Sequence, residues 1–318
     1  MNKISKGLFS SLAVGSLFML TVGCSTPAQK NDSAPQENKK IQVVTSFYPL
    51  ADFTKNVGKD NIEVHNLIQP GVEPHDWEPT PKDMKTISQA DVFIYNGAGF
   101  EPWIEKVLNS VDKSKLVVVD ASKGIELLKA EETAPEHGDE HQQTLYDSHI
   151  WLDPVNAEKE VQQITEALVQ KDPQNKDKYE ANAKEYTSKL EALNQEFQTE
   201  LGKVKNKEII TTHAAFGYLA KRYGLQQIPL MGLAPDAEPS PKEMANVVKE
   251  ARAHDVKYIF FETLVSPKVA DTVAKEIGAK TLVLNPIEGL SEDELKQGED
   301  YISKMRENLK NLTIALGN

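Results

Sequence analysis

Short apolar segments alternate with longer amphipathic ones along most of this 318-residue chain. Within the first half, the apolar segments are residues 43–46, 62–68, 90–95 and 115–120. They run with few polar interruptions, as parallel strands do when helices cover both faces of their sheet. The helical patterns between them indicate right-handed crossover connections, so we predict a twisted parallel sheet.

The same succession recurs in the second half, where residues 209–212, 227–233, 256–261 and 280–285 match the first four segments in order. The heptapeptide Glu-Pro-Thr-Pro-Lys-Asp-Met at 78–84 also returns, as Glu-Pro-Ser-Pro-Lys-Glu-Met at 238–244. Each copy has a capping hydroxyl residue, a proline and then an acid, which together are typical of a helix start. We therefore predict two copies of one βαβαβαβ unit.

A long polar stretch separates the two copies. Its second part, residues 175–202, has no Gly or Pro before Gly202 and carries an apolar stripe. The stripe recurs at steps of three and four residues, at Tyr179, Ala183, Tyr186, Leu190, Leu193 and Phe197. This spacing predicts one continuous helix. The expected fold is α/β, with two similar lobes, each a mostly parallel sheet flanked by helices, at residues 41–154 and 206–318. One long rigid helix within the linker 155–205 joins them and limits how far they can close.

Residues 1–23 have the features of a secretion signal, with two early lysines followed by an uncharged, largely apolar stretch. The stretch ends at Val-Gly-Cys-Ser, which resembles a bacterial lipobox in which Cys24 becomes lipidated, although Thr21 stands where such motifs usually carry Leu. The alternative is an ordinary signal peptide with an incidental cysteine. Residues 24–40 lack apolar periodicity and are predicted to form a flexible tether.

Charge and cysteine content narrow the class of protein. The formal net charge is −12, and such an acidic chain argues against nucleic acid as a partner. Because Cys24 is the only cysteine, no intramolecular disulfide can form, and the fold must be stabilised by its hydrophobic cores.

Three of the seven histidines, His75, His149 and His213, fall where predicted strands run out into loops. Ligands of open α/β sheets bind outside the carboxyl ends of the strands, and several imidazoles around one point suit Zn²⁺. Glu288 occupies the place in the second copy that His149 occupies in the first. With two groups from each lobe, the four residues predict a metal site in the cleft between the lobes.

Asp76, Asp153 and Glu262 are alternative candidates for the fourth ligand. Glu262 is the strongest of these because it ends an apolar strand, whereas Asp153 suits a carboxylate that orients a ligating imidazole. His65 and His254 are interpreted as structural. The acidic insert 131–141, with its two histidines, is interpreted as a solvated loop, with a weak metal-capture site as the alternative.

Three segments carry a resemblance to a known family: Pro-His-Asp-Trp-Glu-Pro-Thr at 74–80, Ser-His-Ile-Trp-Leu-Asp-Pro at 148–154 and Thr-His-Ala-Ala-Phe-Gly-Tyr at 212–218. They resemble the zinc and manganese solute-binding lipoproteins of bacterial ABC transporters, especially the ZnuA-like members, over essentially the whole mature chain. That family binds one metal ion between two α/β lobes and passes it to a membrane permease. The resemblance implies a monomeric, non-enzymatic receptor, held on the outer face of the cell membrane by a lipid on Cys24.

Carried over by position, the family's histidine ligands fall on His75, His149 and His213, and its variable fourth position, water or a carboxylate, lies near Glu288. Manganese members tend to carry a carboxylate at the third position, so a third imidazole favours Zn²⁺. Two other functions are weighed beside a zinc receptor: a manganese receptor of the same family, and a zinc hydrolase with Glu262 or Glu288 as general base. The chain lacks the His-Glu-x-x-His motif of many zinc hydrolases, and an added adhesin role stays open.

Overall fold

The computed structural model describes residues 40–130, 145–233, 241–254 and 257–317. The predicted signal, Cys24 and all but the last residue of the predicted tether lie outside these residues, as do His137 and His141 of the acidic insert. None of the helices in the described part is long and apolar enough to cross a membrane.

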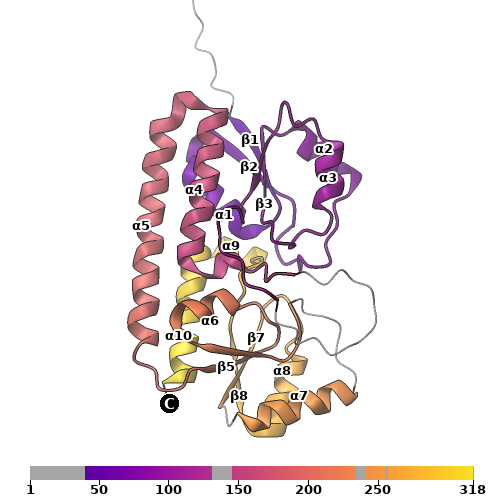
Figure 1. Ribbon diagram of the computed structural model, residues 1–318, viewed down its shortest axis with the longest axis vertical. Helices are drawn as coiled ribbons and strands as arrows, with labels where there is room; N and C mark the ends of the chain where they lie inside the picture. The colour runs from indigo at the N-terminus through magenta and orange to yellow at the C-terminus, as the bar shows by residue number, and fades with distance from the viewer. Residues whose placement is uncertain (1–39, 131–144, 234–240, 255–256, 318) are drawn as a thin grey trace, which may run out of the picture. The chain divides into compact units, whose positions relative to one another are not determined.

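Two parallel sheets form the framework of the protein (Figure 1). Each has four strands, and the two sheets share one strand order. The first sheet, in the order β2-β1-β3-β4, contains β1 (Ile41–Thr45), β2 (Ile62–Asn66), β3 (Val92–Tyr95) and β4 (Val117–Asp120). The second, in the order β6-β5-β7-β8, contains β5 (Glu208–Thr211), β6 (Gln226–Pro229), β7 (Tyr258–Phe261) and β8 (Lys280–Val283). The predicted duplication and α/β fold class are therefore confirmed.

Strand β2 departs from the expectation that helices cover both faces of every strand. It lies at the edge of the first sheet and ends at Asn66, two residues before the predicted end at Ile68. Glu63 and His65 on this strand are exposed. A strand at the edge of a sheet can place alternate polar side chains in solvent. The largely apolar segment 62–68 therefore did not show that both faces of β2 are buried.

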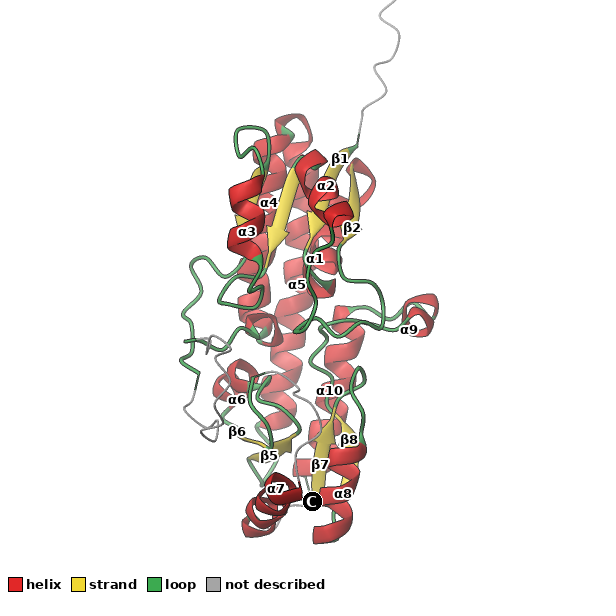
Figure 2. Cartoon of the chain, turned by 90° about the vertical axis from the view of Figure 1, so that its right-hand side faces the viewer, coloured by secondary structure: helices red, strands yellow, loops and turns green. Residues whose placement is uncertain are grey.

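Helices connect the strands and cover the sheets. Those of the first sheet are α1 (Tyr48–Gly58), α2 (Pro81–Gln89) and α3 (Ile104–Ser110). Those of the second are α6 (Gly217–Tyr223), α7 (Pro241–Ala253), α8 (Lys268–Ile277) and α10 (Tyr301–Leu316). The short helix α9 (Glu292–Lys296) follows β8 but stands away from that sheet (Figure 2). The helix start predicted for the first heptapeptide is confirmed, because Thr80 caps α2 in a reciprocal box with Asp83. The second copy leads directly into α7, but its capping residue lies outside the described residues.

Helices α4 (Pro154–Lys171) and α5 (Lys176–Leu201) follow the first sheet and precede the second in the sequence. In space they run side by side (Figure 1). The predicted continuous helix at 175–202 agrees with α5 to within one residue at each end. Its apolar stripe is largely buried, and the helix packs against α1, α4 and α10, so α5 contacts elements of both sheets. The domain boundaries at 154 and 205 remain predictions.

One hydrophobic core extends along these helices and includes residues from both halves of the chain, such as Phe47, Trp151, Phe197 and Tyr301. Each sheet has a smaller core on its other face. The loops that leave the carboxyl ends of the strands lie between the two sheets (Figure 2). The shared core keeps the two sets of loops facing each other.

Candidate metal centre

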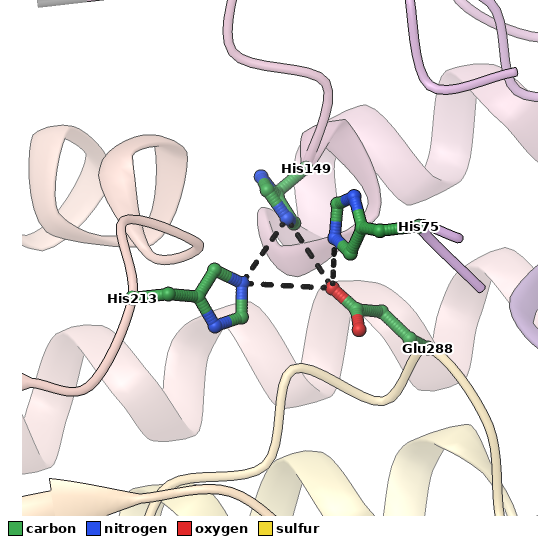
Figure 3. A group of neighbouring side chains, drawn as sticks. All are labelled: His75, His149, His213 and Glu288. Carbon is green, nitrogen blue, oxygen red and sulfur yellow. Dashed lines mark hydrogen bonds and ion pairs between the residues drawn. The ribbon is translucent and has the colours of Figure 1, made fainter. Parts of the chain in front are cut away.

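Four side chains from four separate loops meet between the sheets: His75, His149, His213 and Glu288 (Figure 3). His75 follows β2, and His149 immediately precedes a short 3-10 helix, Ile150–Leu152. His213 follows β5, and Glu288 follows β8. One ligand atom from each lies within 4.8 Å of all the others, and among the described residues this is the one group with that property. The structure thus brings together the four residues predicted as ligands.

The spacing of the donor atoms suits a tetrahedral ion. Glu288 Oε1 lies 3.2 Å from His75 Nε2, 3.3 Å from His149 Nε2 and 3.7 Å from His213 Nε2. The Nε2 atoms of His149 and His213 are 3.4 Å apart. Zinc bound at about 2.0–2.1 Å by four donors would place them about 3.3–3.4 Å apart. Four of the six donor pairs therefore already lie near the spacing that Zn²⁺ requires.

The centre is closed off from solvent except near one ligand. His149 and His213 are fully buried and Glu288 is 2% exposed, whereas the His75 side chain is 13% exposed. The turn that carries His75 is held by Glu73, whose carboxylate accepts hydrogen bonds from the backbone N–H groups of His75 and Asp76. A cation would therefore reach the site beside His75.

Asp147, which the sequence analysis missed, fixes the ring of His149. Its Oδ1 accepts hydrogen bonds from the backbone N–H of His149 at 2.9 Å and from Nδ1 at 2.8 Å. The expectation that Asp153 orients an imidazole was wrong, because Asp153 caps α4 through Val155 N and forms an ion pair with Arg222. In the Asp-Ser-His segment, a carboxylate two residues before a candidate histidine ligand could have indicated that Asp147 orients that ring.

Glu262 stands behind His213 rather than among the donors. Its Oε1 lies 2.6 Å from His213 Nδ1, an ion-pair distance at which the ring N–H is not aligned for a hydrogen bond. Glu262 also accepts a hydrogen bond from the Thr212 hydroxyl. Asp76 is exposed and does not join the group, nor do His65 and His254, which the sequence analysis interpreted as structural.

The loop before Glu288 is held firmly. Ile287 is buried with a φ of 57°, a conformation that β-branched residues rarely adopt. Its N–H donates to Asn285 Oδ1, and Trp151 Nε1 donates to the carbonyl of Pro286 at 2.7 Å. The surrounding bonds therefore maintain a strained backbone that aims Glu288 at the three histidines.

Buried charges of both signs balance one another in this centre. Burial alone would raise the pKa of Glu288, but the three imidazoles outweigh it and hold that pKa well below its usual range. Burial lowers the pKa of His213, but Glu262 and Glu288 outweigh it and raise the value to about 10. Despite its burial, Asp147 and Glu288 also raise the pKa of His149. The buried carboxylates of this centre therefore favour positive charge beside them, which a divalent cation can also supply.

Comparison with known proteins gives consistent matches over most of the chain. A family model described as zinc-uptake complex component A, periplasmic, matches residues 43–315. The high-affinity zinc uptake system protein ZnuA of Bacillus subtilis is 46% identical over 98% of this chain and 97% of that protein. The zinc-binding lipoprotein AdcA of Streptococcus pneumoniae is 41% identical over 98% of this chain but only 60% of its own length. The Zn(II)-bound ZnuA-like domain of that AdcA superimposes with a TM-score of 0.77 at 39% identity, covering 88% of this chain and all of that domain.

Proposed function

Because this chain belongs to the ZnuA family of zinc-uptake components, we propose that it captures Zn²⁺ outside the cytoplasm and delivers it to the membrane permease of an ABC importer. His75, His149, His213 and Glu288 are the proposed ligands of one zinc ion, which is the cargo. The observation that carries this proposal is the convergence of their donor atoms, at near-tetrahedral spacing, from loops of both sheets.

The donor set favours zinc over manganese. Three imidazole nitrogens and one carboxylate oxygen suit Zn²⁺, whereas Mn²⁺ prefers more oxygen donors. Four protein donors also complete a tetrahedral shell, whereas a catalytic zinc keeps one position open for water. We therefore propose a binding protein without enzymatic activity.

The remaining parts of the proposal concern how the protein is held and what it meets. We propose that it is a monomer with two lobes, anchored to the cell membrane by a lipid on Cys24, so that residues 24–40 act as a tether. Support for an extracytoplasmic place comes from the family description and from a relative named as a lipoprotein. The acidic balance of the chain again argues against a nucleic-acid partner.

Zinc titration tests the proposal directly. Ligand that binds only the folded state at about 1,000 times its Kd adds about 4 kcal/mol to the free energy of unfolding, so the Tm should rise by several degrees. Elemental analysis of the dialysed protein should find one zinc per chain, and Mn²⁺ should raise the Tm less at equal concentration. A Tm that zinc leaves unmoved would refute the proposal.

Zinc binding should release protons, because the imidazoles must be neutral to bind metal. A pKa of about 10 means that His213 holds its proton near pH 7 when no zinc is bound, and the raised pKa of His149 favours its protonated form. The affinity for zinc should therefore keep rising with pH above about 6.5, where unperturbed histidines would already have lost their protons. Calorimetry in buffers of different ionisation enthalpy counts these protons.

The raised pKa of His213 also makes the stability of the protein without bound zinc depend on pH. For His213 the folded-state pKa lies above the unfolded value, so its contribution is complete below about pH 6.5 and is lost as the pH rises toward about 10. The stabilisation by zinc should consequently grow over this window. A binding enthalpy that is the same in every buffer would contradict proton release.

A further inference from the structure

We propose that Asp147 positions His149 for metal binding and that helix α6, which belongs to the second sheet, holds Asp147 in place. Residues of α6 that touch no metal would then control the geometry of the centre. The inference rests on the proposed zinc function and adds to it a set of positioning residues: Asp147, Gly217 and Tyr218.

The first step is the contact between Asp147 and His149. One carboxylate oxygen, Oδ1, accepts from both the backbone N–H and the ring Nδ1 of His149. Two bonds to a single atom restrict rotation of the ring, and donation from Nδ1 leaves Nε2 free to face Glu288 and His213. Metal-binding histidines commonly depend on such a partner, whose loss typically costs about 10–100-fold in metal affinity.

The second step is the support that α6 gives to the backbone of Asp147. The Tyr218 hydroxyl donates to the Asp147 carbonyl at 2.8 Å and accepts from Leu128 N–H at 3.0 Å. The Asp147 N–H in turn donates to the Leu128 carbonyl at 2.9 Å. Tyr218 thus connects the second sheet to the two chain segments that place Asp147.

The third step is the close approach of Gly217 to the Asp147 carboxylate. A Cβ atom at Gly217 would lie 2.5 Å from Asp147 Oδ2, a distance that side chains do not tolerate. The backbone of Gly217 does not have a positive φ, so the glycine is needed for space rather than for conformation. The first residue of α6 therefore limits where the carboxylate can sit.

A fourth contact fixes the far end of the segment that carries His149. Arg222, at the end of α6, donates to both carboxylate oxygens of Asp153, with Nη2 at 2.6 Å from Oδ2. The segment from Asp147 to Asp153 is thus held against α6 at both ends, with His149 between them. His213 lies four residues before α6 begins, so this one helix helps to place two of the four proposed ligands.

The test uses the full chain and measures zinc affinity, the Tm of the metal-free protein and the visible absorption of bound Co²⁺, which reports coordination geometry. Gly217→Ala should weaken zinc binding by about tenfold or more and alter the Co²⁺ spectrum. Gly232→Ala is the matched control, because nothing lies within 4 Å of a Cβ at that glycine. Asp147→Asn should weaken binding by about 10–100-fold.

A double-mutant cycle separates positioning from general damage to the fold. In an Asp147→Ala background the carboxylate is gone, so Gly217→Ala should cost little further affinity. Tyr218→Phe should lower zinc affinity. In contrast, Tyr179→Phe on α5, which removes a hydroxyl that donates to Asp172, should lower only the Tm. Fully additive losses, or wild-type zinc affinity in both Asp147→Asn and Gly217→Ala, would overturn the inference. Failure of the wild-type protein to bind zinc would instead refute the proposed function.

Discussion

Replacing Glu288 with glutamine is expected to weaken zinc binding by about 1,000-fold, or roughly 4 kcal/mol. Glu288 is the one carboxylate among the four proposed ligands, and its Oε1 lies within 3.2–3.7 Å of all three imidazole Nε2 atoms. The substitution removes a negative charge that the site holds ionised in a buried place, where charge interactions are strong. The loss should exceed the 10–100-fold typical of a residue that only orients a ligand.

Glu160→Gln is the matched control for this change. Glu160 is also a fully buried carboxylate, on α4, but neither of its oxygens has a hydrogen-bond partner. Burial raises its pKa well above the usual value, so glutamine resembles its protonated form. Competition with a chelator of known affinity measures both variants. Equal zinc affinity in Glu288→Gln and the wild type would exclude Glu288 as a ligand.

Replacing Trp151 with alanine is expected to cost about 3–5 kcal/mol of the free energy of unfolding, the range for large aromatic residues in cores. Trp151 is fully buried and packs edge-on against Phe47, with 4.7 Å between ring centroids. Its Nε1 donates to Pro286 in the loop before Glu288, and its carbonyl accepts from the Tyr301 hydroxyl of α10. The residue therefore joins the core of the first sheet to two elements of the second.

Chemical denaturation of the metal-free protein measures this cost, and Trp151→Phe divides it into two parts. Phenylalanine keeps much of the packing but leaves the Pro286 carbonyl without its donor, so a loss of about 1–3 kcal/mol is expected. Because that carbonyl lies two residues before Glu288, zinc affinity should fall as well. A loss below about 1 kcal/mol for the alanine variant would contradict the role of Trp151 as a connection between the two halves.

The sequence predicted most of the fold because its main features are local and periodic. The apolar segments, the repeated helix start at Thr80 and the unbroken stripe of α5 each depend on neighbours a few residues away. Strand β2 was the exception, since an edge position depends on which strand pairs with it. Its apolar character did not reveal that one side would be open to solvent.

The same reasoning identified the four residues that converge in the centre, since the carboxyl ends of parallel strands meet at one edge of a sheet. Because the segments occur in the same order in both copies, Glu288 could be predicted as a ligand from its correspondence with His149. The supporting carboxylates were harder to assign. Asp147, which orients His149, was not considered, and Asp153 was instead predicted to orient an imidazole. Glu262 was considered as a ligand, although it lies on the Nδ1 side of His213.

Residue types and spacing by themselves predicted two duplicated parallel sheets, one long helix and a set of candidate metal ligands at strand ends. Only the tertiary structure decided which carboxylate faces which imidazole nitrogen and how α6 presses against Asp147. The physical reason is the distance along the sequence over which each feature is determined. Periodic burial is set within one element, whereas a hydrogen bond such as that from Tyr218 to Asp147, 71 positions apart, is set by how two elements pack.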